Sequence, residues 1–262
     1  KINNSKNLPD ILEDTTGSIL FTYDDKYVFY SKLDKNHRAK TIFLHKIGTT
    51  QKLDKLIYQE KIDRFSVSIY PTSDEKFFII SSGDHSTNKC YYLNSNLKSF
   101  KLNLFKDFKE NITYSLDSWN GYFYNHTNDN AVDFKIERAS HSSINNVKVF
   151  VPPKKDTIIG SYLILNDWFI WSETKNANQK IFIINFSSNI IREIDFFKEP
   201  IKSLSISTYE KNKKSNYIYI SYSSPKSPNK VFLYNIKNEK KKVVKKQIIP
   251  SGFNEEDYIT ER

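Results

Sequence analysis

The sequence predicts an all-β fold, a β-propeller in which about five four-stranded antiparallel blades are visible. Two observations support this prediction. Short runs of apolar and β-branched residues alternate with turn residues, as in residues 66–82 (SVSIYPTSDEKFFIISS), where two strands flank a turn and no helical spacing is present. The same succession of four strands then returns at intervals of 45 to 48 residues, a period typical of propeller blades.

The elements follow in the same order in every repeat. We assign the blades to residues 18–65, 66–111, 112–156, 157–202 and 203–249. Each blade opens with a hairpin, expected over 18–32, 66–82, 112–127, 157–174 and 203–224. The third and fourth strands are expected over 41–47 and 55–61, 88–94 and 100–105, 132–140 and 147–153, 179–186 and 190–196, and 230–236 and 241–250.

Turn residues recur at one position of each repeat, between the first and second strands. They are Asp24-Asp25, Ser73-Asp74, Asn120-Gly121, Asn166-Asp167 and the loop 210–216. Isolated four-stranded sheets would expose an apolar face, so we expect the blades to stack, with Trp119, Trp168 and Trp171 in the packing between them. An aromatic stacking platform and an antiparallel sandwich are the alternatives. The regular period argues against the sandwich.

Composition narrows the class of function. The net charge of +10 would suit a nucleic-acid partner, but no RNA-binding signature or finger spacing accompanies it, and we expect no nucleic-acid binding. The lysines of 238–247 (NEKKKVVKKQ) are expected to protect an exposed sheet edge. No apolar run approaches a membrane span, and no leader is visible. The single cysteine, Cys90, is interpreted as a buried apolar residue, which fits a reducing, cytoplasmic location.

The sequence shows no catalytic motif of its own. No G-x-S-x-G nucleophile turn is present, and its nearest approach, Gly83-Asp84-His85-Ser86-Thr87, is interpreted as a surface loop. The histidines are far apart, so neither a metal nor a cofactor is expected: they are His37, His45, His85, His126 and His141. The acidic pairs Asp24/Asp25 and Glu255/Glu256 are interpreted as a hairpin turn and a solvated tail.

Several segments together resemble the propeller of oligopeptidase B, in the prolyl oligopeptidase family of serine peptidases. Residues 40–81 (KTIFLHKIGTTQKLDKLIYQEKIDRFSVSIYPTSDEKFFIIS) follow that family's order of strands, including an H-x-x-G-T turn from His45. The segments TYSLDSWNGYFYNHTN at 113–128 and YISYSSPKSPNKVFLYNI at 219–236 are similar to later hairpins. The closing PSGFNEEDYITER at 250–262 resembles the family's exit from propeller to catalytic domain.

The resemblance implies a seven-bladed propeller that caps an α/β-hydrolase domain. It also implies that the whole enzyme hydrolyses short peptides after Arg or Lys. The chain starts at Lys1 and contains no Met, and we expect it to be part of a longer product. Residues 1–17 are then the outer edge of a preceding blade, and 250–262 link to a missing catalytic domain of the same protein. The Ser-Asp-His triad lies outside this sequence, so the resemblance supplies no catalytic residue, and the chain is expected to be inactive alone.

Two groups of residues are candidates for a role in such an enzyme. If the first strand of each blade is the inner one, a central channel is bordered by Ser66, Ser68, Tyr70, Tyr114, Asp117, Asn166, Ser205 and Tyr209. An interdomain hinge would contain Pro250, Gly252, Phe253, Tyr258, Glu261 and Arg262.

Other functions stay open at this point. A stand-alone propeller that binds a protein or peptide partner is the main alternative to the peptidase segment. A five-bladed glycosidase propeller is a further one, but its paired carboxylates on inner strands are not evident in the sequence.

Overall fold

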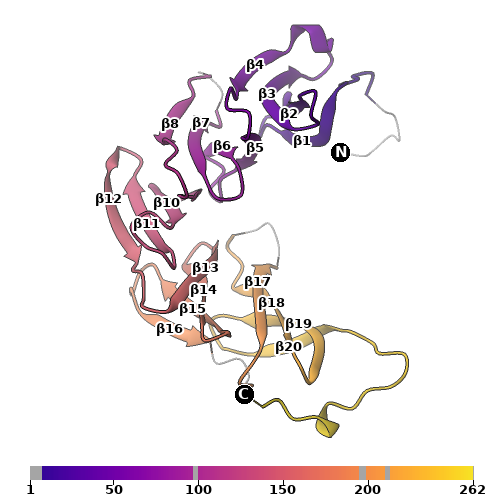
Figure 1. The fold of residues 1–262 in the computed structure, drawn as a ribbon, viewed down its shortest axis with the longest axis vertical. Coiled ribbons are helices and arrows are strands. Elements are labelled where there is room, and N and C mark those ends of the chain that lie inside the picture. The colour runs from indigo at the N-terminus through magenta and orange to yellow at the C-terminus, as the bar shows by residue number, and fades with distance from the viewer. Residues whose placement is uncertain (1–7, 97–99, 195–198, 210–212, 262) are drawn as a thin grey trace. The chain divides into compact units, whose positions relative to one another are not determined.

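The computed structural model describes residues 8–96, 100–194, 199–209 and 213–261. Within these residues the chain forms five separate four-stranded sheets and two single-turn 3-10 helices. In every sheet, the hydrogen-bonded strands lie side by side in chain order, as Figure 1 shows by the regular progression of colour. The all-β prediction is confirmed, and the two-sheet sandwich is excluded because the strands divide into five sheets.

The strands of the five sheets have the following bounds. The first sheet contains β1 (Thr15–Phe21), β2 (Tyr27–Leu33), β3 (Ala39–Lys46) and β4 (Lys55–Gln59). The second contains β5 (Ser66–Pro71), β6 (Phe77–Gly83), β7 (Asn88–Asn94) and β8 (Asn103–Lys106). The third contains β9 (Tyr114–Trp119), β10 (Tyr122–Thr127), β11 (Lys135–Ser140) and β12 (Ser143–Val151).

The last two sheets repeat the pattern. The fourth contains β13 (Thr157–Ile164), β14 (Trp168–Lys175), β15 (Asn178–Asn185) and β16 (Ile191–Ile194). The fifth contains β17 (Ser203–Thr208), β18 (Tyr217–Ser224), β19 (Ser227–Asn235) and β20 (Lys241–Lys246). Each sheet therefore corresponds to one predicted repeat.

The strand boundaries differ from the expected ones by a few residues. The largest consequence is at the start, where Thr15 pairs with Lys32 of β2. Residues 15–17, which the sequence assigned to a preceding unit, therefore belong to β1 of the first sheet. Parts of two expected segments, 195–196 of the fourth strand in the fourth sheet and 210–212 of the last hairpin loop, lie outside the described residues.

The first two hairpins turn by the same hydrogen bonds. Thr22 and Thr72 each donate a hydroxyl hydrogen bond to the aspartate two residues on, over 2.6 Å to Asp24 and 2.9 Å to Asp74. The same aspartates accept the backbone N–H groups of the lysines that follow. Short polar side chains that bond to their own backbone stabilise tight turns, so the T-x-D turn is a local cause of the repeated fold.

The second strands of three sheets are buried on both faces. The runs YVFY in β2, FFII in β6 and WFIW in β14 are almost entirely buried, whereas β5 and β17 alternate between buried and exposed side chains. A strand covered on both sides reads as a continuous apolar run rather than an alternating one. In these three sheets the second strand is therefore the most buried one, and the first strand forms one of the two edges.

The chain divides into two compact units, each with its own core. Unit 1 comprises residues 1–130 and 136–150, and unit 2 comprises residues 131–135 and 151–262. In unit 1, the first and second sheets pack face to face through Phe29, Ile42, Leu44, Val67, Phe78, Ile80 and Leu93. The second and third sheets pack through Phe77, Ile79, Cys90, Phe105, Tyr114, Leu116 and Phe123. Cys90 is fully buried there, as predicted.

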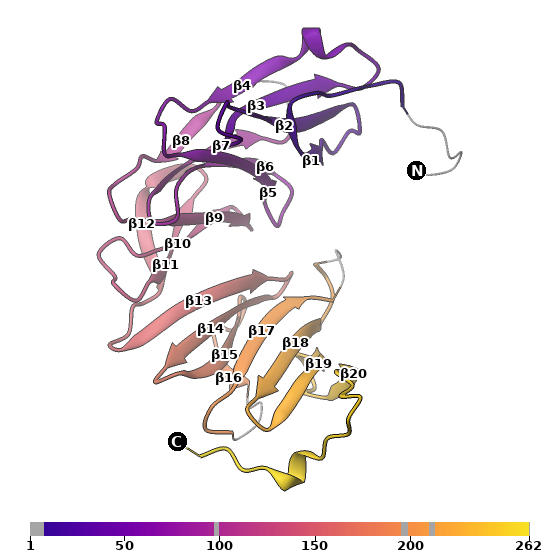
Figure 2. The same cartoon turned by 45° about the vertical axis from the view of Figure 1, so that its right-hand side comes forward.

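Unit 2 repeats this stacking with the fourth and fifth sheets, which lie side by side in Figures 1 and 2. Its core contains Leu165, Ile170, Ile181, Ile183, Ile194, Leu204, Ile218, Ile220, Tyr222, Phe232, Tyr234 and Ile236. Trp168 packs against this core, as expected of an aromatic residue between blades. Burial of each large apolar side chain contributes about 1.5 to 3 kcal/mol, so stacking of sheets is the main source of stability in each unit.

The outer edge of the fifth sheet carries the predicted row of lysines. Every residue of β20 (KKVVKK) is exposed, and the strand pairs only with β19 among the described strands. Charged side chains along an unpaired edge oppose pairing with another chain. The expectation that 238–247 contains a strand with lysines at an exposed sheet edge is confirmed for β20.

Candidate functional site

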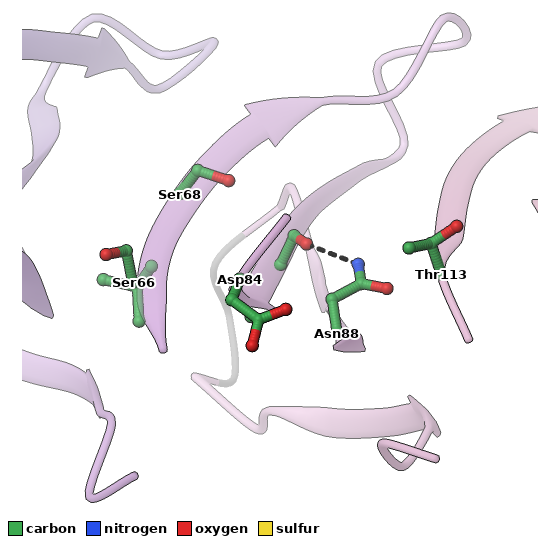
Figure 3. A pocket seen from close by; sticks show the side chains of 8 residues that line it. Ser66, Ser68, Asp84, Asn88 and Thr113 are labelled. Atoms are coloured by element: carbon green, nitrogen blue, oxygen red, sulfur yellow. Dashed lines mark hydrogen bonds between the residues drawn. The ribbon is translucent and has the colours of Figure 1, made fainter. Parts of the chain in front are cut away.

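A shallow pocket of about 280 Å³ lies in unit 1, where the second sheet meets the residues that lead into β9. Figure 3 shows Ser66 and Ser68 of β5 on one side and Thr113 on the other, with Asp84 and Asn88 between them. Ser81 and Gly83 of β6 and Val67 complete the lining. Two of the residues predicted to border a channel, Ser66 and Ser68, therefore share one surface.

The turn from β6 to β7 fixes the acidic group of this pocket. One oxygen of Asp84, Oδ1, accepts the backbone N–H groups of Ser86 and Thr87, each over 2.9 Å. These hydrogen bonds hold the pKa of Asp84 below its usual value, and the nearby Arg64, 3.4 Å from Oδ2, acts in the same direction. A carboxylate engaged in this way shapes the turn and does not serve as a general acid.

Gly83 is required where β6 ends. A Cβ atom placed there would lie 2.2 Å from the carbonyl oxygen of Thr87 and 2.3 Å from Cβ of Asn88. Only a residue without a side chain permits this close approach. The segment Gly83–Thr87, interpreted from the sequence as a loop, is a tight turn between two strands, although Thr87 itself is buried.

Asn88 closes the pocket on the side of the third sheet. Its Oδ1 accepts the backbone N–H of Tyr114 over 2.7 Å, and its Nδ2 donates to the carbonyl of the same residue over 2.9 Å. Nδ2 also lies 2.8 Å from Oγ of Ser81, the dashed line in Figure 3. The amide of Asn88 therefore joins β7 to β9 by a pair of hydrogen bonds, as the backbone of a neighbouring strand would.

Three other predicted channel residues lie in the contact between the second and third sheets. Tyr114 is buried in the apolar cluster and Tyr70 packs against it, and burial raises the pKa of the Tyr70 hydroxyl. Asp117 binds the β5–β6 turn: its Oδ1 accepts the N–H of Ser73 and its Oδ2 accepts the hydroxyl of the same serine, both over 2.6 Å. In the structure, Tyr70, Tyr114 and Asp117 therefore hold the second sheet against the third.

The remaining channel candidates belong to unit 2. Asn166 bonds through its N–H to the carbonyl of Lys213 over 2.7 Å. Ser205 is exposed on β17, and the ring of Tyr209 lies 5.5 Å from that of Tyr219. Because the two units are described separately, these residues and the pocket of unit 1 are not parts of one described site.

A serine, a histidine and an aspartate meet beside the β5–β6 turn, a contact that the sequence analysis did not predict. Oγ of Ser118 lies 2.9 Å from Oδ2 of Asp74 and 2.8 Å from Nε2 of His141. In an acyl-transfer triad the histidine stands between the other two groups and the serine is accessible. Here Ser118 stands in the middle and is fully buried, and burial lowers the pKa of His141. The set links the second sheet to the third.

His45 also has carboxylate partners that its sequence position did not reveal. Its Nδ1 lies 2.7 Å from Oδ1 of Asp54 and its Nε2 lies 2.9 Å from Oδ1 of Asp10. Asp10 belongs to the segment that precedes β1, so the buried ring fastens that segment to the first sheet. Within the described residues, no group of three or more His, Cys, Asp or Glu side chains is arranged to hold a metal ion.

The predicted hinge residues form a small folded loop after β20. Gly252 has φ of +83°, a left-handed conformation that glycine adopts without strain, and Pro250 and Glu261 are exposed. The rings of Phe253 and Tyr258 stack with centroids 5.0 Å apart. Arg262 lies outside the described residues. No helix long and apolar enough to cross a membrane is found in the described part of the chain.

One interpretation of this loop is wrong. Glu255, assigned from the sequence to a solvated tail, is only partly exposed and forms ion pairs with Lys230 over 2.6 Å and Lys246 over 3.5 Å. Lys230 lies on β19 and Lys246 on the edge strand β20 of the fifth sheet, and the sequence alone did not place these strands near the tail. Its neighbour Glu256 is exposed, as expected.

Comparison with known proteins places this architecture in a family. The sequence model of the family described as prolyl oligopeptidase, N-terminal beta-propeller domain, matches residues 1–247. Protease 2 of Moraxella lacunata is 20% identical over 94% of this chain, which covers 35% of that protein. Dipeptidyl aminopeptidase BI of Pseudoxanthomonas mexicana is 24% identical over 97% of this chain, which again covers 35% of the relative. The chain thus spans about a third of the length of these curated relatives.

Solved structures agree with the family match. The fold is similar to that of oligopeptidase B from Leishmania major, with a TM-score of 0.88 and 20% identity, over 98% of this chain and 38% of that one. Oligopeptidase B from Trypanosoma brucei, in a closed form with covalently bound antipain, gives a TM-score of 0.86 and 21% identity over 95% of this chain and 36% of that one. At these identities the likeness establishes the fold.

Proposed function

Because this chain belongs to the family of the prolyl oligopeptidase N-terminal β-propeller domain, we propose that it is the non-catalytic propeller portion of an oligopeptidase B-like serine peptidase. The whole enzyme would be cytoplasmic and hydrolyse short peptides after Arg or Lys. The observation that carries the proposal is the match of 98% of the chain to the oligopeptidase B fold, at a TM-score of 0.88.

We assign the chemistry to a separate α/β-hydrolase domain of the same protein. The contact of Asp74, Ser118 and His141 supports this assignment, because its serine is buried and occupies the wrong position for acyl transfer. Residues 250–262 would lead towards that domain and serve as an interdomain hinge.

The propeller's role would be to control access of substrate to the catalytic domain. Under this proposal, the exposed edge strand β5 of unit 1 borders the route of the peptide with the small hydroxyl side chains of Ser66 and Ser68. Tyr70, Tyr114 and Asp117 would act indirectly, by holding β9 against β5 and β6.

A peptidase assay tests the proposal. A short fluorogenic peptide with arginine before the reporter group is offered to the 262-residue chain and to the same chain extended along its reading frame by several hundred residues. We expect hydrolysis only by the longer protein, and loss of that hydrolysis with a serine-directed covalent inhibitor. Silence of both proteins would contradict the proposal and favour a propeller that binds a protein or peptide partner, whereas hydrolysis by the short chain would show that it contains a catalytic site.

A further inference from the structure

Two lysines face each other across the last pair of strands. In the register of β19 and β20, Lys230 lies directly opposite Lys246. Like charges at directly opposed positions of an antiparallel pair repel each other. The edge of the fifth sheet therefore contains a place that favours a negatively charged group between these two side chains.

Glu255 occupies that place. Its Oε2 lies 2.6 Å from Nζ of Lys230 and accepts the hydroxyl of Ser227 over 3.1 Å, while its Oε1 lies 3.5 Å from Nζ of Lys246. Partial burial alone would raise the pKa of Glu255, but the hydrogen bonds from Lys230 and Ser227 and the charge of Lys246 lower it overall. The carboxylate is thus ionised and held by three groups.

The chain on either side of Glu255 leaves the fifth sheet after β20 and returns to the same sheet. After β20, Gln247 pairs with Asn229, its N–H bonding to the carbonyl over 2.9 Å. The chain then leaves the sheet, turns at Gly252 and returns at the 3-10 helix Glu255–Asp257, whose start is capped by Asn254. Among the described residues, each hydrogen bond or ion pair that joins 250–261 to the fifth sheet is made by Glu255.

We propose that residues 250–261 are an electrostatic strap, fastened to the β19–β20 edge by insertion of the Glu255 carboxylate between Lys230 and Lys246 and released when that carboxylate is neutralised or screened. A pocket of about 420 Å³ lies between the strap and the fifth sheet, and Tyr222, Lys226 and Phe253 are among the residues that line it. Under the function proposed above, the linker leaves the fifth sheet at Glu255 and not at the end of β20, because Glu255 is the last described residue attached to the sheet. The strap itself does not depend on peptidase activity.

Hydrogen exchange of the 262-residue chain, followed by mass spectrometry of peptides that cover 248–261, tests the strap. Glu255→Gln removes the charge with little change of shape, and Glu256→Gln makes the same change one residue on, at an exposed side chain without an ion pair in the described structure. We expect exchange in 250–259 to become about tenfold faster in E255Q, as for loss of one charge-assisted contact. E256Q should leave it within about twofold.

Salt and a charge exchange complete the test. Raising the salt concentration from about 0.05 M to about 0.5 M should accelerate exchange of 250–259 in the wild-type chain and in E256Q, but not in E255Q. Should E255Q also accelerate exchange in β18 and β19, the variant that combines Glu255→Lys with Lys230→Glu and Lys246→Glu decides. It reverses all three charges, so a strap regains protection. Equal exchange in E255Q and E256Q, or no rescue by the triple variant, would overturn the proposal.

Discussion

The side chain of Asn88 bonds to both backbone groups of Tyr114, accepting its N–H over 2.7 Å and donating to its carbonyl over 2.9 Å. The two residues belong to different sheets, β7 of the second and β9 of the third. A single amide thus satisfies a donor that would otherwise be buried unpaired, and an acceptor whose other partner is the weakly donating thiol of Cys90 at 3.5 Å. Unpaired buried groups are costly.

Asn88→Ala should destabilise the chain by about 2 to 3 kcal/mol, because the N–H of Tyr114 loses its partner and its carbonyl keeps only the thiol of Cys90. Chemical denaturation followed by tryptophan fluorescence measures the change in the free energy of unfolding. Asn146→Ala on the exposed strand β12 is the matched control and should cost less than about 0.5 kcal/mol. Equal losses in the two variants would show that the amide of Asn88 contributes no specific contact.

The His45 contacts predict a stability that depends on pH. Burial alone would lower the pKa of His45, but Asp10 and Asp54 raise it above its usual value through hydrogen bonds and charge. A raised folded-state pKa means that the contribution is fully present below about pH 6.5 and is lost as pH rises through the folded-state pKa. The neutral ring can donate to only one of the two carboxylates.

We therefore expect the free-energy difference between the wild-type chain and His45→Gln to shrink as pH rises from about 6 to about 10. Denaturant titrations at a series of pH values measure this difference. The exposed His85, changed to Gln, is the control and should show no such trend. A constant difference across the range would mean that the ring does not gain a proton on folding.

The contacts of Glu60 predict that stability falls as the pH is lowered, the opposite of the trend expected for His45. Its buried carboxylate accepts hydrogen bonds from Tyr58, Ser82 and the N–H of Ile62, and lies 3.1 Å from Nζ of Lys89. Burial would raise the pKa of Glu60, yet these partners lower it to about 2. The contribution, about 3 kcal/mol at neutral pH, is present above about pH 4.5 and is lost as pH falls towards 2.

Unfolding measured between about pH 7 and pH 2 checks this expectation for Glu60. The wild-type chain should lose stability more steeply below about pH 4.5 than Glu60→Gln, which lacks the titrating group and is less stable at neutral pH. The exposed Glu256→Gln should follow the wild-type curve. Parallel curves for wild type and E60Q would contradict the role of Glu60.

Gly83→Ala should cost about 1 to 3 kcal/mol, since the added Cβ would lie 2.2 Å from the backbone oxygen of Thr87 and the turn must shift. Gly17→Ala separates crowding from backbone strain: Gly17 has φ of +80°, but nothing lies within 4 Å of the position of its Cβ. Its cost should be the smaller one, about 1 kcal/mol. A larger loss at Gly17 would show that crowding at the β6–β7 turn costs less than a left-handed backbone conformation at a residue with a side chain.

Some contacts between sheets could have been predicted from the sequence, because their partners lie about one repeat apart. Ser73 binds Asp117 at a separation of 44 residues, Arg64 binds Glu110 at 46, and Trp168 bonds to Asn216 at 48. These separations are close to the repeat length, because equivalent positions of adjacent sheets lie face to face. Pairing polar residues one repeat apart would therefore have found these partners, although not their distances or burial.

The sequence by itself determined the strands, their grouping into repeated sheets and the positions of the hairpin turns, because alternation, apolar runs and turn chemistry are local properties repeated along the chain. Only the tertiary structure decided which polar groups meet when they do not lie one repeat apart. Asn88 with Tyr114, Ser118 with His141, and Glu255 with Lys230 each join different elements, and their contacts depend on how the elements pack and how the chain returns to a sheet edge. That is why Glu255, a polar residue in a polar tail, gave no sign of its partners until the sheet was in place.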